Sequence, residues 1–192
     1  EVQFTKRDWR NRNLIKTNNG LKWLTVPVEV KGKYSQKISD TKISDKGWAT
    51  HHWKQIWHNY SKAEHFAEYR SFFEDLFKNA DHDTISQSNE YFLKAICDLL
   101  GIETKIRQSR EFELFGEKSE RLVHICKQLD AKIYLTGPAA KAYLSEDQFN
   151  DAGITVSYLD YSGYPEYPQL WALSLLLLHL LLYLFHQLLF FW

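Results

Sequence analysis

Apolar and polar positions near the start of the chain predict one strand and then a long irregular connection. The segment Trp23–Val28 is rich in β-branched residues and follows an Asn19-Gly20 turn, which is typical of a strand. Pro27 is expected at the end of this strand or on an edge, because proline cannot donate to a sheet ladder. Residues 31–46 are polar and poor in apolar side chains. They predict an exposed loop or an irregular hairpin.

Helical periodicity dominates the next part of the chain. Between residues 48 and 79 apolar side chains recur at helical spacing, which predicts two helices. Ser61 stands three residues before a glutamate, so this capping-box pattern predicts that the second helix begins there. Thr84 repeats the pattern before a third helix, and Gly101 is suited to its left-handed C-terminal cap.

The second half of the chain alternates short strand patterns with helical ones. Alternation of this kind indicates a parallel sheet with helical crossovers. We therefore predict an α/β fold, Rossmann-like, with a mostly parallel sheet and a helical insertion in the first half. The expected elements are a strand at 104–108, a helix at 118–129, a strand at 132–136, a helical piece from Pro138 and a strand at 154–159.

Residues 171–192 differ in composition from the rest of the chain. This segment has no charged residue, half of it is leucine, and it is long enough for a membrane span. Two histidines and a glutamine inside it, and the lack of flanking Lys or Arg, argue against a span. We expect a membrane partner only if this tail is genuine. The alternative is a sequence artefact, such as a frameshifted C-terminus.

Length and charge restrict the class of protein. The 192 residues suit one domain, expected over residues 1–170, and the net charge is zero. This balance excludes a generally basic nucleic-acid wrapper. However, residues 1–54 hold twelve basic and five acidic side chains, so a local anion site remains possible in the first quarter. The chain has no methionine and starts at Glu1, from which we expect a fragment.

The two cysteines and the polar N-terminal segment indicate a compartment. Cys97 and Cys126 are far apart without Cys-x-x-Cys spacing, which argues against a zinc site or a disulfide scaffold. The first residues contain no apolar signal-peptide region. A reducing, cytoplasmic location is the expectation.

Basic side chains surround a tryptophan in the segment Thr5–Asn13. Guanidinium groups bind phosphate or carboxylate with two hydrogen bonds, and an indole can stack on a base or a sugar face. The segment therefore predicts an anion or nucleotide-type site that uses Arg7, Arg10 and Arg12. An ordinary solvated basic segment is the alternative.

Histidines are concentrated in the first predicted helix. His51 and His58 lie two turns apart, but helical metal pairs favour a spacing of four residues with a carboxylate nearby, so we expect no metal site. His52 is a candidate for general acid–base catalysis, because an imidazole titrates near neutral pH. The alternative is a partly buried polar face of the core.

Two further candidate segments follow predicted strands of the second half. Gly137 lies between a strand and a helical piece, where backbone N–H groups can receive an anion, although a simple tight turn fits equally. The loop at 160–169 follows the last strand, where ligands of open α/β sheets bind. Its candidate residues are Asp160, Tyr161, Tyr164 and Gln169.

Several of these stretches together resemble the WbqC-like proteins of bacteria, in the same order over residues 1–170. The resemblance rests on Val2–Asn13, Trp23–Val28, His52-Trp53, Asn59-Tyr60, Leu135–Ala140 and Tyr164–Gln169. Members usually begin with a further strand, of which only Glu1-Val2-Gln3 would remain, and continue after the last element with a charged helix instead of the leucine-rich tail. The resemblance implies a single α/β domain that lacks its N-terminal strand.

The resemblance also implies a function. The family is associated with O-antigen and other surface polysaccharides, and a glycine or acyl transfer to a sugar precursor has been suggested for it. We therefore expect a small-molecule transferase without a cofactor, with His52 and Asp160 as catalytic candidates. A nucleic-acid or nucleotide-binding module without catalysis is the alternative. The expected substrate-binding residues are Gln3, Arg7, Arg10, Arg12, Gly137, Tyr161, Tyr164 and Gln169.

Overall fold

The computed structural model describes residues 3–5, 9–163, 165 and 170–171. Within these residues the chain divides into two compact units. The first unit holds the residues up to 103 together with 170–171, and the second holds the residues from 104 to 165. Each unit has its own sheet and is described separately below.

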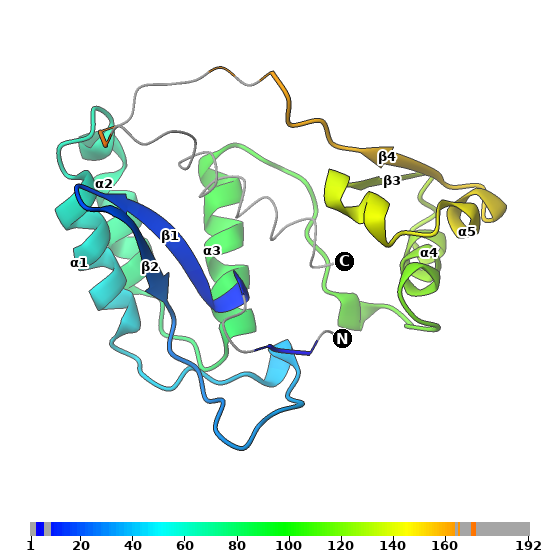
Figure 1. Cartoon of the computed structure of the whole chain (residues 1–192), viewed down its shortest axis with the longest axis horizontal. Helices are drawn as coiled ribbons and strands as arrows, with labels where there is room; N and C mark the ends of the chain where they lie inside the picture. The colour runs from blue at the N-terminus through cyan, green and yellow to red at the C-terminus, as the bar shows by residue number, and fades with distance from the viewer. Residues whose placement is uncertain (1–2, 6–8, 164, 166–169, 172–192) are drawn as a thin grey trace. The chain divides into compact units, whose positions relative to one another are not determined.

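A β-hairpin and three helices build the first unit (Figure 1). The short helix η1 (Trp9–Asn11) leads into β1 (Arg12–Thr17), which pairs antiparallel with β2 (Gly20–Thr25). Gly20 has a φ of +105°, a conformation that L side chains rarely adopt, and this explains a glycine directly after the turn. The strand predicted at Trp23–Val28 is confirmed only over Trp23–Thr25, because β2 begins at Gly20 and ends before the proline.

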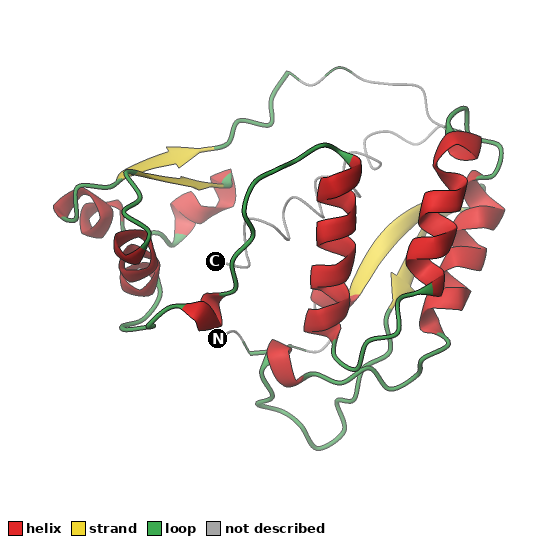
Figure 2. Ribbon diagram, turned by 180° about the vertical axis from the view of Figure 1, so that it is seen from behind, coloured by secondary structure: helices red, strands yellow, loops and turns green. Residues whose placement is uncertain are grey.

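The helices of the first unit are α1 (Trp48–Tyr60), α2 (Phe66–Lys78) and α3 (Ile85–Leu99). Viewed from behind, α1 and α2 lie in front of the hairpin (Figure 2). The Trp48 ring at the start of α1 contacts Phe77 of α2 and Phe92 of α3, with centroids 6.4 and 6.0 Å away. This aromatic cluster joins the three helices into one core.

Two predicted helix starts have different outcomes. The capping box at Thr84 is confirmed, because its hydroxyl accepts from the backbone N–H of Gln87, whose side chain accepts in return. The capping box at Ser61 is wrong, since α2 begins only after His65. Ser61 has helical backbone angles, and its N–H donates to the carbonyl oxygen of Trp57 at 3.0 Å. It therefore ends α1 and cannot take the extended conformation of an N-cap.

The connection between the hairpin and α1 is irregular, as predicted. It contains the short helix η2 (Ile38–Asp40) and an isolated antiparallel bridge between Val28 and Ile43. Phe4 and Ile38 are buried with Ile85 in a small cluster. This cluster attaches the loop to the first turn of α3.

In the second unit, two helices pack on a parallel pair of strands. The strands are β3 (Ile133–Thr136) and β4 (Thr155–Tyr158), and Ile133 pairs with Thr155. Phe149 is fully buried and stacks on Tyr134 with ring centroids 4.8 Å apart. The other elements are η3 (Ser109–Glu111), α4 (Ser119–Gln128), η4 (Pro138–Ala142) and α5 (Glu146–Asp151).

The predicted Rossmann-like fold is wrong. In the part of the chain that the structure describes, the strands form two separate two-stranded sheets, one antiparallel and one parallel, and no extended parallel sheet. The strand at 20–25 pairs with its neighbour in sequence instead of with β3 or β4. No strand forms at 104–108, where the Gln108 N–H donates to the side chain of Glu111 at 2.8 Å. This contact uses the Gln108 N–H, which a strand would need for a hydrogen bond to a neighbouring strand.

The leucine-rich tail after Trp171 lies outside the described residues, so the choice between a membrane span and a sequence artefact is not tested there. Among the helices that the structure describes, none has the length and apolar character needed to cross a membrane.

Candidate functional site

Polar side chains occupy the face of α1 that is turned toward the hairpin. His52, Gln55 and Asn59 are spaced by three and four residues, so they follow one another along one helix face. A helix face that packs on a sheet is usually apolar. We call these three residues the polar face of α1. Two of them, His52 and Asn59, are buried, so packing on the hairpin alone does not explain their polar side chains.

His52 connects α1 to the end of β2. Its Nε2 lies 3.1 Å from the carbonyl oxygen of Thr25, and because that oxygen only accepts, Nε2 carries the proton. The Trp48 ring contacts the imidazole edge-on, with centroids 5.1 Å apart. Burial lowers the pKa of His52 to about 4; the hydrogen bond to Thr25 acts in the opposite direction, and the nearby His51 lowers the pKa further. The imidazole is thus neutral at neutral pH.

The rest of the polar face of α1 is held by contacts from β2 and Trp171 and by one hydrogen bond within α1. Lys22 Nζ on β2 donates to Gln55 Oε1 at 2.7 Å. Asn59 Nδ2 donates to the backbone oxygen of Gln55, also at 2.7 Å. The backbone oxygen of Asn59, in the last turn of α1, accepts from the indole N–H of Trp171 at 2.9 Å. A donor from a distant segment therefore satisfies one of the carbonyl groups that a helix end leaves without a helical partner.

The opposite face of the hairpin carries an arginine and an exposed tryptophan. The guanidinium of Arg12 on β1 lies 4.2 Å from the ring centroid of Trp23 on β2. Both residues are on the face away from the buried Ile15 and Leu24, because side chains alternate along each strand. Nearly half of Trp23 is exposed (48%). This stacked pair, the Arg12–Trp23 pair, places a half-buried guanidinium beside an exposed aromatic surface.

The other residues predicted for the basic segment have different surroundings. Arg10 stacks on the neighbouring Trp9 at 4.4 Å, and its backbone oxygen accepts from Asn89 Nδ2 on α3 at 3.0 Å. Gln3 Nε2 donates to the backbone oxygen of Tyr34 at 2.8 Å, so the exposed Gln3 is attached to the loop. Arg7 lies outside the described residues.

In the second unit the two predicted segments meet at the carboxyl ends of β3 and β4. The Leu159 N–H donates to the Thr136 oxygen at 2.8 Å, which continues the parallel ladder past β4. Gly137 and Asp160 come directly after these two residues. Hydrogen bonds from Ser162 are the main cause that lowers the pKa of Asp160, and Lys141 contributes by charge attraction. The carboxylate is therefore ionised at neutral pH.

A tyrosine and a carboxylate form a second contact near this edge. The Tyr158 hydroxyl donates to Glu146 Oε1 at 2.6 Å, and this hydrogen bond is the main cause that raises the pKa of Tyr158 to about 12. Lys141 Nζ lies 4.8 Å from the Tyr158 ring centroid. Tyr161 follows Asp160 in the described chain, whereas Tyr164 and Gln169 lie outside it.

The two catalytic candidates belong to different units. His52 is in the first unit and Asp160 is in the second. Their joint role therefore stays a prediction. No group of three or more metal-ligating side chains occurs among the described residues.

Comparison with known proteins identifies the family. The model of the WbqC-like protein family matches residues 1–173. The chain belongs to the WbqC-like protein family. It is also 46% identical over 171 residues to the uncharacterized protein Rv1507c of Mycobacterium tuberculosis, which is 89% of this chain and 74% of the relative. No solved structure matches the chain.

Sequence reasoning missed several residues of this WbqC-like protein that the structure brings together. Gln55 has no distinctive pattern around it, Asn59 enters only as part of the Asn59-Tyr60 pair of the family resemblance, and Lys22 is one of many lysines. The available signal was the spacing of His52, Gln55 and Asn59, which indicates one polar helix face. That signal does not say which element the face contacts.

Proposed function

We propose that this WbqC-like protein transfers a glycyl or other acyl group to a sugar precursor in the biosynthesis of bacterial O-antigen or another surface polysaccharide. The family resemblance supplies the reaction class. The observation that carries the proposal is the Arg12–Trp23 pair, a cation beside an exposed indole. Such a pair suits a negatively charged activated group with an adjoining ring.

In the proposed reaction an amino or hydroxyl group of the sugar attacks the activated acyl carbon. A carbon–nitrogen or carbon–oxygen bond forms, the bond to the activating group breaks, and the proton of the attacking group passes to a base. Asp160 and His52 are separate candidates for this base, and neither is a strong one, because the pKa of His52 is about 4 and that of Asp160 is lowered from its ordinary value. Asp160 is the more accessible of the two, since its carboxylate is exposed and ionised, whereas His52 is buried with its Nε2 on the Thr25 oxygen. We assign His52 a positioning role between α1 and β2.

Binding of activated groups tests this proposal. The probes are UDP-N-acetylglucosamine as an activated sugar and acetyl-coenzyme A as an acyl donor, each measured by isothermal titration calorimetry. We expect at least one probe to bind and Arg12→Ala to weaken its binding about tenfold or more, because a hydrogen bond to a charged group contributes about 1.5–3 kcal/mol. Arg70→Ala is the matched control, since Arg70 stacks on Trp57 of the same unit at 4.0 Å.

Two results would contradict the proposal. One is that neither probe binds, and the other is that Arg12→Ala and Arg70→Ala have equal effects. Retention of a short single-stranded oligonucleotide, with an affinity that falls steeply as salt rises, would instead favour the nucleic-acid-binding alternative.

A further inference from the structure

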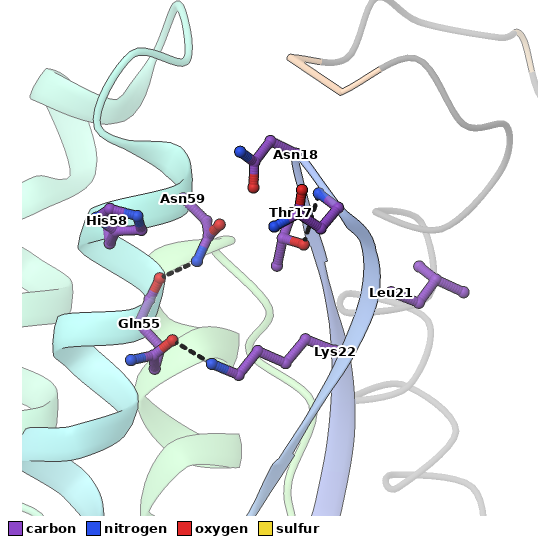
Figure 3. Close-up of a pocket in the computed structure, with 8 residues that line it drawn as sticks. Thr17, Asn18, Leu21, Lys22, Gln55, His58 and Asn59 are labelled. Atoms are coloured by element: carbon purple, nitrogen blue, oxygen red, sulfur yellow. Dashed lines mark hydrogen bonds between the residues drawn. The ribbon is translucent and has the colours of Figure 1, made fainter.

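A polar cleft lies between the tip of the hairpin and the C-terminal half of α1 (Figure 3). Its volume is about 490 Å³, within the range of small-molecule sites. None of the predicted site residues that the structure describes lines it. Its polar walls are formed by Thr17, Asn18 and Lys22 from the hairpin and by Gln55, His58 and Asn59 from α1.

The side chains of this cleft supply hydrogen-bond donors and one positive charge. Lys22 uses one of its three donors on Gln55 Oε1, and the Nε2 group of Gln55 adds further donors at the same place. Asn18 and Asn59 bring amide groups, which both donate and accept. No carboxylate is among the described residues that line the cleft. The cleft therefore suits a ligand with many hydroxyl groups and a negative charge.

Both walls of the cleft are fixed before a ligand arrives. On the hairpin side, Thr17 Oγ1 donates to the Gly20 oxygen at 2.8 Å and accepts from the Asn19 N–H at 3.2 Å. On the helix side, the indole of Trp171 holds the backbone of Asn59, which is only 5% exposed. Groups that are already oriented lose little conformational entropy on binding.

We propose that this cleft binds a small polyhydroxylated acid, such as a sugar acid. The Lys22 ammonium group pairs with the carboxylate of the ligand. The amide groups of Gln55 and Asn59 bind its hydroxyl groups. The proposal does not rest on the transferase reaction, because the Arg12–Trp23 pair does not line the cleft.

A set of three probes separates the parts of this proposal. D-glucuronate carries the acid and the hydroxyl groups, D-glucose lacks the acid, and cyclohexanecarboxylate lacks the hydroxyl groups. In ligand-observed NMR with the full chain we expect glucuronate to bind at least about tenfold more tightly than either of the others. Glucose loses the charged hydrogen bond, and cyclohexanecarboxylate loses several neutral ones. Equal binding of all three, or no binding of glucuronate, would overturn the proposal.

Matched variants locate the binding. Lys22→Ala should weaken glucuronate binding about tenfold. Gln55→Glu keeps the side-chain length and an acceptor for Lys22, but its charge should repel glucuronate while leaving the weak binding of glucose. Lys54→Ala removes the same charge from an exposed position of α1 outside the lining and should change nothing.

A loss of binding in Lys54→Ala equal to that in Lys22→Ala would refute the location. Arg12→Ala should leave glucuronate binding intact. This variant distinguishes failure of the cleft from failure of the proposed transferase function.

Discussion

The buried imidazole of His52 makes the stability of the first unit dependent on pH. The folded protein holds the pKa of His52 at about 4, below its ordinary 6.5. As pH falls through 6.5, the unfolded chain therefore takes up a proton that the folded chain does not. Above that pH the burial of the neutral ring has no such penalty. Stability is thus full above about pH 6.5 and decreases down to about pH 4.

The size of this effect follows from the pKa difference. Between 6.5 and about 4, at about 1.4 kcal/mol for each pH unit, the total loss is roughly 3 kcal/mol. At pH 5 the loss is about 2 kcal/mol. The variant His52→Gln cannot titrate, but its amide can still donate to the Thr25 oxygen. The free energy of unfolding of this variant should therefore fall by about 2 kcal/mol less between pH 7.5 and pH 5 than that of the wild type.

Urea unfolding followed by tryptophan fluorescence is a suitable assay. Six of the seven tryptophans belong to the first unit, so the signal reports mainly on the unit that contains His52. His58→Gln, at an exposed position of the same helix, removes one imidazole as well and should keep the wild-type pH dependence. If His52→Gln and the wild type lose the same free energy between these pH values, the reasoning about the buried neutral ring is wrong.

Two further predictions concern the second unit, measured by urea unfolding with far-UV circular dichroism. Phe149→Ala should lower the free energy of unfolding by about 3–5 kcal/mol because the ring is fully buried, whereas Phe115→Ala, at a side chain that is 56% exposed, should change it by less than about 1 kcal/mol. Lys118→Gly should raise the free energy of unfolding by about 1 kcal/mol, because Lys118 has a φ of +48°, which glycine adopts without strain. Lys127→Gly should lower it by about 1 kcal/mol, because glycine is unfavourable inside α4. Equal effects within either pair would contradict these explanations.

Local patterns in the sequence predicted the elements well where the deciding contacts are also local. The capping box at Thr84 needs only residues 84–87, and the turn before β2 depends on Asn19 and Gly20. The same rule failed at Ser61, since the last turn of α1 competes for the same residue. Sequence pattern alone does not decide between two local structures that share a residue.

The sheet arrangement could not be read from the sequence in the same way. Strand patterns identify β2, β3 and β4, but they do not specify which strand pairs with which. Alternating strands and helices predict one sheet. In the structure, however, β2 pairs within its own hairpin and β3 pairs with β4.

The candidate site was predictable only in part, for a similar reason. Composition predicts a site at the segment with Arg10 and Arg12, and position after strands predicts one at the edge with Gly137 and Asp160; both stay predictions. The contact of His52 with Thr25 joins residues 27 positions apart. No spacing rule predicts it, because it depends on how the hairpin packs on α1.

The contact between Trp171 and Asn59 has a consequence for the order in which the protein can mature during translation. These residues are 112 positions apart, and residues 104–165 of the second unit lie between them. The ribosome therefore releases α1 long before the indole that satisfies its last turn has been synthesised. Until then water must hydrate the Asn59 oxygen, and a nascent chain can complete the C-terminal end of α1 only after residues 104–165 have been made.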